Sequence, residues 1–265
     1  MIHRYMAMAV GGLILTLAAF AWARRWRGQV SSGVLWPTVT LLWVGVQGAF
    51  GALTVTMKLF PLIVTLHLMG GLVLLALLTL QVQRQRLTSE LRASVQISCA
   101  LYAATFLGLF LLTLQVLLGG WVSTNYAVLA CNTFPQCQNS WWPLMNFEQG
   151  FTLWRHLGLA ANGQPLTFES LTAIHYVHRL GAYVVLVYLA TLAVRLRRVQ
   201  GLSASAHLLL GGLVLQLLTG LSNVVFDWPL VAAVLHTGGA AALVVVLVWI
   251  LTGVRVSRRT VLNGL

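Results

Sequence analysis

Four histidines at matched positions are the residues of this chain best suited to hold a metal. They are His3, His67, His178 and His236, of seven histidines in 265 residues. Each falls within the same third of a long apolar stretch, where an ionisable side chain is expected to be functional. A single histidine there could be a hydrogen-bonded helix contact. Neutral imidazole is also the commonest metal ligand, so we expect the matched four to ligate a metal.

An internal repeat relates the four histidines in pairs. Ile2-His3-Arg4 matches Val177-His178-Arg179 at an offset of 175 residues. Five further identities occur at an offset of 169 residues. They are Gln47 with Gln216, Gly51 with Gly220, Leu66 with Leu235, His67 with His236, and Gly70 with Gly239. Paired His and Gln at constant offsets are not expected by chance, so the pattern predicts two homologous half-bundles.

The repeat predicts two metal sites of the same kind. Two histidines on neighbouring helices of a four-helix bundle can hold one haem iron between them. One site would combine His3 with His67, and the other His178 with His236. Zinc is less favoured, because its sites usually form a tighter cluster with Cys or carboxylate. Glycines about one turn after His67 and His236 would let a flat macrocycle approach the backbone.

Three polar residues accompany these histidines. Arg4 and Arg179 each follow a candidate ligand directly, where a guanidinium can pair with a haem propionate. The alternative is an arginine that reaches the membrane surface by snorkelling. His175 shares roughly one helix face with His178, so we expect it to be a supporting or pocket residue rather than a ligand.

The composition identifies an integral membrane protein. Hydrophobic residues make up 59% of the chain and charged residues 8%, with a mean hydropathy of +0.87. A soluble domain is nearer a quarter charged. Seven apolar stretches each have about the 20 residues that a helix needs to cross a bilayer. The predicted fold is therefore all-α, with transmembrane helices at 5–23, 34–56, 60–82, 97–119, 173–194, 204–226 and 229–252.

The repeat divides these helices into a pseudo-symmetric tandem of two four-helix bundles, the first incomplete. Residues 1–95 would form an N-terminal half of three helices, and residues 96–265 a C-terminal bundle of four. The long loop at 120–172 contains Cys131 and Cys137. On an oxidising outer face these would form a disulfide, with two free thiols as the alternative. Cys99 is expected to be a small buried hydrophobic residue.

The basic residues set the expected orientation. Twelve of the sixteen Lys and Arg fall in alternate loops or at the C-terminus, and four on the other side. Lys and Arg gather on the cytoplasmic side of membrane proteins. We therefore expect a multi-pass protein of the cell inner membrane, with the N-terminus outside and the C-terminus in the cytoplasm. This placement of basic residues accounts for the net charge of +12, so the lipid bilayer is the expected partner and nucleic acid is not.

Several segments resemble haem A synthases, a family of cytochrome oxidase assembly enzymes. The likeness covers the whole chain and is most specific in the long loop. The matching segments are Gly119-Gly120-Trp121-Val122-Ser123-Thr124-Asn125-Tyr126-Ala127, Ala130-Cys131, Phe134-Pro135-x-Cys137, Trp141-Trp142-Pro143, Ile174-His175-Tyr176-Val177-His178-Arg179 and Met1-Ile2-His3-Arg4-Tyr5.

The resemblance implies an oxidoreductase that converts the C8 methyl group of haem O, through the alcohol, to the formyl group of haem A. By the same resemblance, His178 and His236 would hold the iron of a haem b cofactor in the C-terminal half. His3 and His67 would bind the substrate haem O in the N-terminal half. Haem O synthase and cytochrome oxidase assembly factors would be partners, and a homo-oligomer is also allowed.

The chain departs from the family pattern at its start. Family members carry a further first helix and an outer loop with another cysteine pair. They also have an acidic residue three positions before the first histidine, a position that here falls ahead of Met1. We therefore expect the first transmembrane helix and first outer loop to be lacking, and the catalytic residue stays unknown.

Other classes of protein share part of this pattern. A transmembrane dihaem electron-transfer protein resembling cytochrome b561 would have the same four histidines, but it would not explain the Trp-rich loop and its cysteine pair. A haem transporter or chaperone would bind haem reversibly and without a redox step. A non-haem transporter built of parallel repeats is a further alternative.

Overall fold

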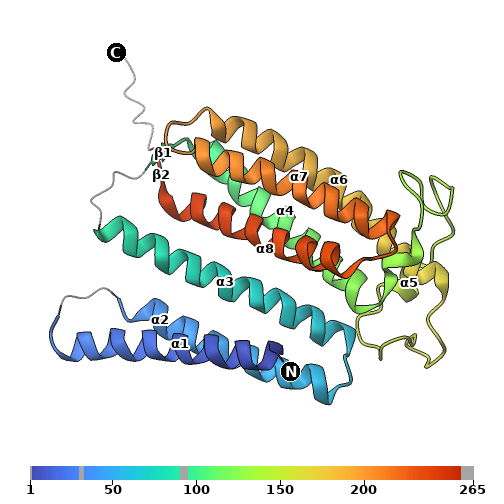
Figure 1. Ribbon diagram of the computed structural model, residues 1–265, viewed down its shortest axis with the longest axis horizontal. Coiled ribbons are helices and arrows are strands. Elements are labelled where there is room, and N and C mark those ends of the chain that lie inside the picture. Colours follow the sequence, from blue (N-terminus) through green and yellow to red (C-terminus); the bar gives the residue numbers. More distant parts are fainter. Residues whose placement is uncertain (1, 30–32, 90–94, 258–265) are drawn as a thin grey trace, which may run out of the picture.

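The structure is a computed structural model that describes residues 2–29, 33–89 and 95–257. Within that part, seven helices are long and apolar enough to cross a membrane, which confirms the predicted multi-pass helical protein. The helices run side by side in one bundle (Figure 1). They are α1 (Ile2–Trp26), α2 (Leu35–Thr56), α3 (Pro61–Ser89), α4 (Cys99–Thr124), α6 (Phe168–Arg197), α7 (Ser203–Val225) and α8 (Leu230–Gly253).

Some helices extend beyond the spans expected from hydropathy. The third was expected to end at residue 82, but α3 continues to Ser89, and α6 begins at Phe168 rather than at residue 173. Hydropathy marks only the part of a helix that lies in hydrocarbon, whereas backbone hydrogen bonding can continue beyond it. With 29 residues, α3 is about 44 Å long, against about 30 Å of hydrocarbon.

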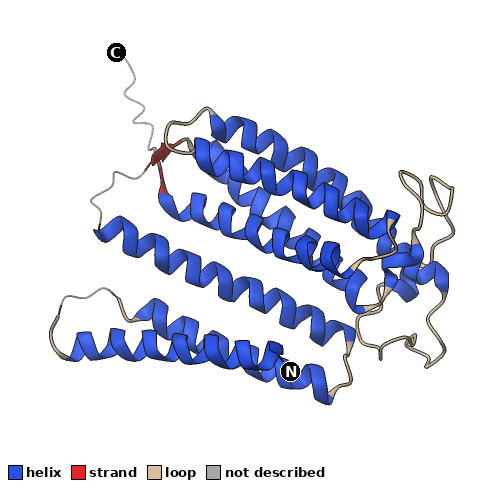
Figure 2. Cartoon of the chain, in the orientation of Figure 1, coloured by secondary structure: helices blue, strands red, loops and turns tan. Residues whose placement is uncertain are grey.

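Four short elements complete the fold. The loop between α4 and α6 contains a 3-10 turn, η1 (Ala127–Ala130), and the single-turn helix α5 (Phe147–Gly150). At the opposite end of the bundle, β1 (Val95–Ile97) pairs in parallel with β2 (Val254–Val256) (Figure 2). The sequence analysis did not predict this pair, since strands of three residues carry too short a pattern. It joins the start of α4 to the end of α8.

Helices α4, α6, α7 and α8 form a four-helix bundle. Each packs against two neighbours in the cyclic order α4, α6, α7, α8, so α6 and α8 occupy diagonal corners. Side chains that point inward from α6 and α8 therefore face each other across the centre. The core next to them is made of fully buried aliphatic side chains, among them Leu189, Leu196, Leu209, Leu247 and Ile250.

The first three helices repeat part of this arrangement. Helix α2 packs against both α1 and α3, as α7 packs against both α6 and α8. Helix α3 also packs against α4 and α8 and so joins the two halves (Figure 1). Helix α1 buries only Ile14 and Ala18, and most of its other side chains are exposed.

The α2–α3 and α7–α8 turns have the same backbone geometry. Lys58 and Leu59 have φ values of 52° and 58°, and Asp227 and Trp228 have values of 53° and 62°. In each turn the amide of the second residue donates to a carbonyl five residues earlier, at 2.9 and 3.0 Å. Residues other than glycine seldom adopt positive φ. Because positive φ values recur at positions 169 residues apart, the two halves repeat in backbone conformation as well as in sequence.

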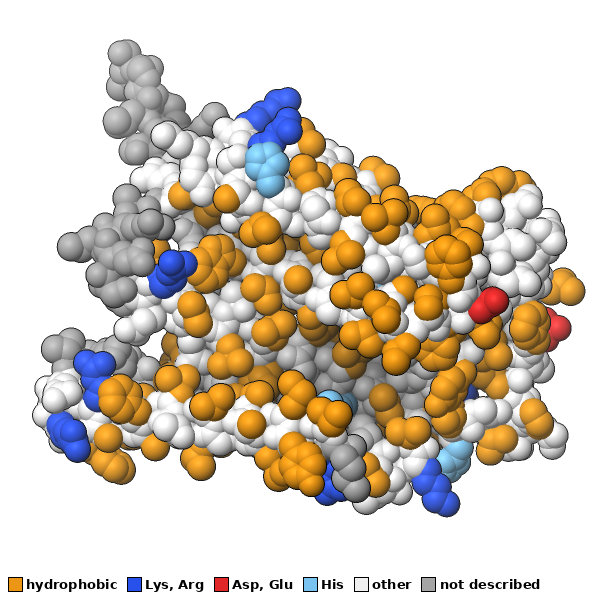
Figure 3. Space-filling view, viewed as in Figure 1, with side chains coloured by type: hydrophobic (Ala, Val, Ile, Leu, Met, Phe, Trp, Pro, Cys, Tyr) orange, Lys and Arg blue, Asp and Glu red, His pale blue; other side chains and the backbone are white. Residues whose placement is uncertain are grey.

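Charged side chains are concentrated towards the two ends of the bundle. Hydrophobic side chains cover the helix flanks in Figure 3, and the acidic groups visible there lie at the end that carries the α4–α6 loop. One expectation about a side chain was wrong. Cys99 is exposed, because it is the first residue of α4 and does not yet lie between packed neighbours.

Candidate functional site

The α4–α6 loop, residues 125–167, packs on one end of the C-terminal bundle. Cys131 and Cys137 are fully buried in it and form a disulfide, as predicted. η1 contacts both α4 and α6. The loop is therefore a packed part of the bundle end, close to the turn of α6 that carries the candidate ligand His178.

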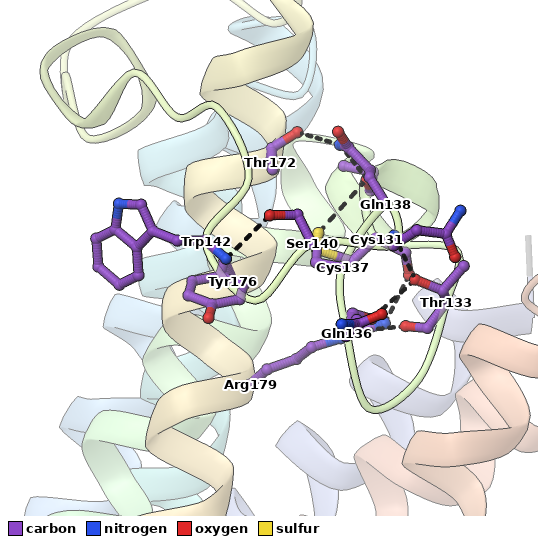
Figure 4. Close-up of a disulfide and its surroundings, with 12 residues drawn as sticks. Cys131, Thr133, Gln136, Cys137, Gln138, Ser140, Trp142, Thr172, Tyr176 and Arg179 are labelled. Atoms are coloured by element: carbon purple, nitrogen blue, oxygen red, sulfur yellow. Dashed lines mark hydrogen bonds between the residues drawn. A yellow bond between two sulfur atoms is a disulfide. The ribbon is translucent and has the colours of Figure 1, made fainter.

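Arg179 of α6 binds the segment between Cys131 and Cys137, which we call the disulfide segment (Figure 4). Its Nη1 donates to the carbonyls of Thr133 and Gln136 at 2.7 and 3.1 Å. Its Nη2 donates to the carbonyl of Cys131 at 2.6 Å. Hydrogen bonds from a charged donor are among the stronger ones. Because Arg179 follows His178 directly, these bonds couple the position of the loop to that of the candidate ligand.

Two further residues of α6 hold the same loop. Thr172 accepts a hydrogen bond of 2.8 Å from Nε2 of Gln138, and the hydroxyl of Tyr176 donates to the carbonyl of Trp141. With Arg179, they present polar groups to the loop from about two turns of one helix. Of these three residues, only Thr172 lies in the part of α6 that precedes the span expected from hydropathy.

Arg155 is a buried cation within the loop itself and has a structural role that the sequence did not indicate. It is 3% exposed, and its Nη2 donates to Oδ1 of Asn125 at 2.6 Å. Its guanidinium lies 5.5 Å from the ring centroid of Trp121. Burial lowers the pKa of Arg155 below its usual value. Its contacts join the middle of the loop to the end of α4.

The structure brings His3 and His67 together and places His178 and His236 on two helices of the C-terminal bundle. The rings of His3 and His67 have centroids 6.3 Å apart and planes at 71°. His178 and His236 lie on the diagonal helices α6 and α8, each with its ring against a glycine of a neighbouring helix. Among the described residues, no group of three or more His, Cys, Asp or Glu could hold a bare metal ion. Any metal bound by these histidines would therefore have at most two imidazole ligands.

The spacing of the first pair fits a metal held between two imidazoles. Nitrogen-to-metal bonds of about 2 Å on either side, plus the radii of the rings, give a centroid separation of roughly 6 Å. The observed value for His3 and His67 is 6.3 Å. The 71° between their planes is compatible with axial ligation, because each imidazole can turn independently about its own bond to the metal.

Three of the histidines rest against a glycine on a neighbouring helix. A Cβ atom on Gly51, Gly119 or Gly220 would lie 3.3, 3.0 or 3.1 Å from Cε1 of a histidine ring. The respective rings are those of His67, His178 and His236. These distances are tighter than ordinary contact. A side chain at any of the three positions would press on the imidazole.

A glutamine one turn before each of these glycines fills a second gap. The side chains of Gln47, Gln115 and Gln216 occupy the space where a Cβ would stand on Gly70, Gly181 and Gly239, three residues after each histidine. Nε2 of Gln115 and of Gln216 donates to the backbone carbonyl of His178 and of His236, at 2.9 Å in both cases. We call each Gln-x-x-x-Gly pair a histidine seat.

The seats revise one interpretation of the sequence. Gly70 and Gly239 were expected to leave space for a macrocycle, but glutamine side chains fill that space. Gly71 and Gly238 meet nothing within 4 Å of a Cβ position and stay open. The repeat showed that the glutamines recur at matched positions, but the sequence did not show that they contact the histidines.

Substitution of the glycine against which a seat glutamine packs is expected to destabilise the bundle. Gly239→Ala would place a methyl group on the Gln216 amide, which its bond to the His236 carbonyl holds in place. We expect a loss of about 1–3 kcal/mol in the free energy of unfolding in detergent. Gly238→Ala is the matched control, because it enters open space and gains helix propensity. Equal effects of the two changes would contradict the packing of the Gln216 side chain against Gly239.

The ring nitrogens of the seated histidines differ in their partners. Nδ1 of His236 lies 2.9 Å from Oγ1 of Thr219, and Nδ1 of His178 lies 3.0 Å from Nε2 of Gln115. Nδ1 of His67 is buried without a hydrogen-bond partner. The histidines of the C-terminal half are therefore held at the ring, and His67 is not. Thr219 escaped the sequence analysis, since threonine is unremarkable in a membrane helix.

The remaining candidate residues lie outside the pairs. His175 is 4% exposed, and its Nδ1 has no hydrogen-bond partner, so it is a buried polar side chain one turn before His178. Arg4 is exposed at the start of α1. His156 and His207 are exposed as well.

The seven spans define a multi-pass helical membrane protein, and one pair of its histidines, His3 and His67, lies in ring contact. Residues 1–248 match the family COX15-CtaA, described as cytochrome oxidase assembly protein. The chain belongs to this family.

Individual relatives agree with this assignment. The chain is 37% identical over 250 residues to the Heme A synthase of Shewanella oneidensis, covering 94% of this chain and 74% of that protein. It is 25% identical over 256 residues to the Heme A synthase of Rhizorhabdus wittichii, covering 93% and 68%. A match to the Heme A synthase of a Bradyrhizobium species is 28% identical over 276 residues, covering 98% and 69%.

Proposed function

We propose that the protein is a haem A synthase, which oxidises the C8 methyl group of haem O, through the alcohol, to the formyl group of haem A. One observation carries the proposal. Histidines that recur in the sequence lie in pairs, and the ring spacing of one pair fits a metal between them. Membership of a cytochrome oxidase assembly family supports the substrate class.

The hydrogen bonds favour different roles for the two halves. An acceptor that binds the free N–H of a ligating imidazole orients the ring and strengthens its bond to the metal. Oγ1 of Thr219 is such an acceptor for His236, whereas His178 faces the amide nitrogen of Gln115 and Nδ1 of His67 has no partner. We assign the resident haem b to His178 and His236. The substrate haem O, which must enter and leave, is assigned to His3 and His67.

The chain's own residues would bind, orient and enclose these groups. When bound, haem b supplies one-electron transfer close to the substrate. The disulfide segment and Arg179 keep the loop over the His178 turn and limit the access of water to it. Arg4 is proposed to contact a propionate. Arg179 would have to share its guanidinium between a propionate and the three loop carbonyls that it already binds.

The distribution of charge supports a location in the cell inner membrane. The loop end, which carries Glu148, Glu169 and Asp227, would face outward. The end with β1 and β2 would face the cytoplasm. Haem O synthase is the proposed source of the substrate, and the assembly apparatus of cytochrome oxidase the destination of the product.

Expression in a host that makes haem O but lacks its own haem A synthase tests this function. Extracted pigments should contain haem A, and the purified protein should carry haem. A dihaem electron-transfer protein would bind haem in two bis-imidazole sites and make no haem A. A transporter or chaperone would release its haem unchanged. Either result would replace the proposal.

Removal of the disulfide should have a smaller effect. In a Cys131→Ser, Cys137→Ser protein, Arg179 still binds the loop carbonyls, and the short closed loop limits the stabilisation lost to about 2–3 kcal/mol. We expect haem A formation to fall only a few-fold in the pigment assay. Complete loss in a protein that still folds would show that the cysteines take part in the chemistry.

A further inference from the structure

We infer that Thr219 is a positioning residue that sets the protonation of His236, so that Nε2 of this histidine is free to bind iron. The inference rests on the proposed function for the identity of the metal, but its geometric part does not. Thr219, Gln216 and Gly220 lie on one turn of α7 and contact the ring or the backbone of His236.

The hydrogen bonds of the threonine fix the direction of its bond to the histidine. A hydroxyl has one proton to donate. Oγ1 of Thr219 donates to the carbonyl of Leu215 at 2.7 Å, in the same helix. The oxygen is therefore an acceptor towards His236, 2.9 Å away, and Nδ1 of the neutral ring must carry the proton. That tautomer leaves the lone pair of Nε2 available for a metal.

The other two seats lack this group. Positions three residues after the seat glutamines are occupied by Phe50 in α2 and Leu118 in α4. His178 instead faces an amide nitrogen of Gln115, and Nδ1 of His67 is unpartnered. Of the three seated histidines, only His236 has its tautomer fixed by an acceptor. The hydroxyl should also make Nε2 of His236 more basic, and a more basic ligand favours ferric iron.

Two measurements test the inference, the first without any haem. Nitrogen-15 chemical shifts of His236 in the haem-free protein should show a proton on Nδ1 in the wild type. Thr219→Val keeps the shape and removes the acceptor, and should shift the ring towards the Nε2-protonated form. Thr219→Ser should restore the wild-type shifts. A wild-type ring protonated at Nε2 would overturn the inference, whether or not the protein binds haem.

The second measurement uses protein loaded with haem b in a His67→Ala background, so that only the C-terminal pair remains. Thr219→Val should raise the reduction potential and weaken haem binding by about 10-fold, and Thr219→Ser should reverse both effects. Thr191→Val is the matched control, because Thr191 makes the same bond within its helix, to the carbonyl of Val187, but is exposed and touches no histidine. An unchanged potential in Thr219→Val would overturn the inference. If the His67→Ala protein with Thr219 intact took up no haem, the proposed function would be contradicted instead.

Discussion

Replacement of His236 by alanine should remove the resident haem and stop haem A formation. The change deletes one of the two imidazoles that would hold the haem in the C-terminal bundle and leaves only His178. Loss of a group that hydrogen-bonds to a ligand costs about 10- to 100-fold in metal affinity, so loss of the ligand itself should cost more than about 100-fold. The haem content of purified protein and the haem A content of membranes would measure the two effects.

His207→Ala is the matched control for this variant. His207 lies on the neighbouring helix α7 but is exposed near its start, and it belongs to no histidine pair. Its replacement should leave both haem content and haem A formation unchanged. If His236→Ala kept both at the wild-type level, the assignment of the C-terminal pair would be wrong.

Replacement of His67 by alanine should separate substrate binding from cofactor binding. His67 lies on α3 with its ring against Gly51 of α2, and α3 is not one of the four helices that form the C-terminal bundle. We expect haem A formation to fall to background, while the haem spectrum of the C-terminal half stays that of the wild type. Pigment extraction and optical spectra of the same membranes give both values.

His156→Ala serves as the control for this second variant. His156 is exposed in the loop and packs edge-on against Phe60, with ring centroids 5.6 Å apart. Its loss should lower stability slightly without changing the product. A His67→Ala protein that still made haem A at the wild-type rate would contradict the assignment of the N-terminal pair to the substrate.

The transmembrane helices could be predicted because the bilayer fixes both their composition and their length. Lipid satisfies no backbone hydrogen bonds, so an apolar stretch of sufficient length must be helical. The pairing of His67 with His3 was predictable as well, since a repeat with constant offsets places its copies equivalently. The ends of α3 and α6 were not predictable from hydropathy, because polar residues continue these helices beyond the hydrocarbon.

The partners of the polar side chains were harder to predict. Arg179 binds three backbone carbonyls, and every residue of a loop offers such an acceptor, so sequence does not indicate which ones a guanidinium will reach. Thr219 makes the bond within its own helix that many helical threonines make, and only the packing of α7 on α8 places His236 beside it. The seat glutamines were visible in the repeat, but their contacts depend on the gaps left by glycines.

Electron paramagnetic resonance and optical spectra of the purified protein, loaded with haem, test the central claim most directly. The account predicts six-coordinate, low-spin haem with two imidazole ligands, and two separable components that His67→Ala and His236→Ala each remove singly. Protein that stays colourless would contradict the account, as would haem whose spectrum is unaffected by replacing any of the four paired histidines.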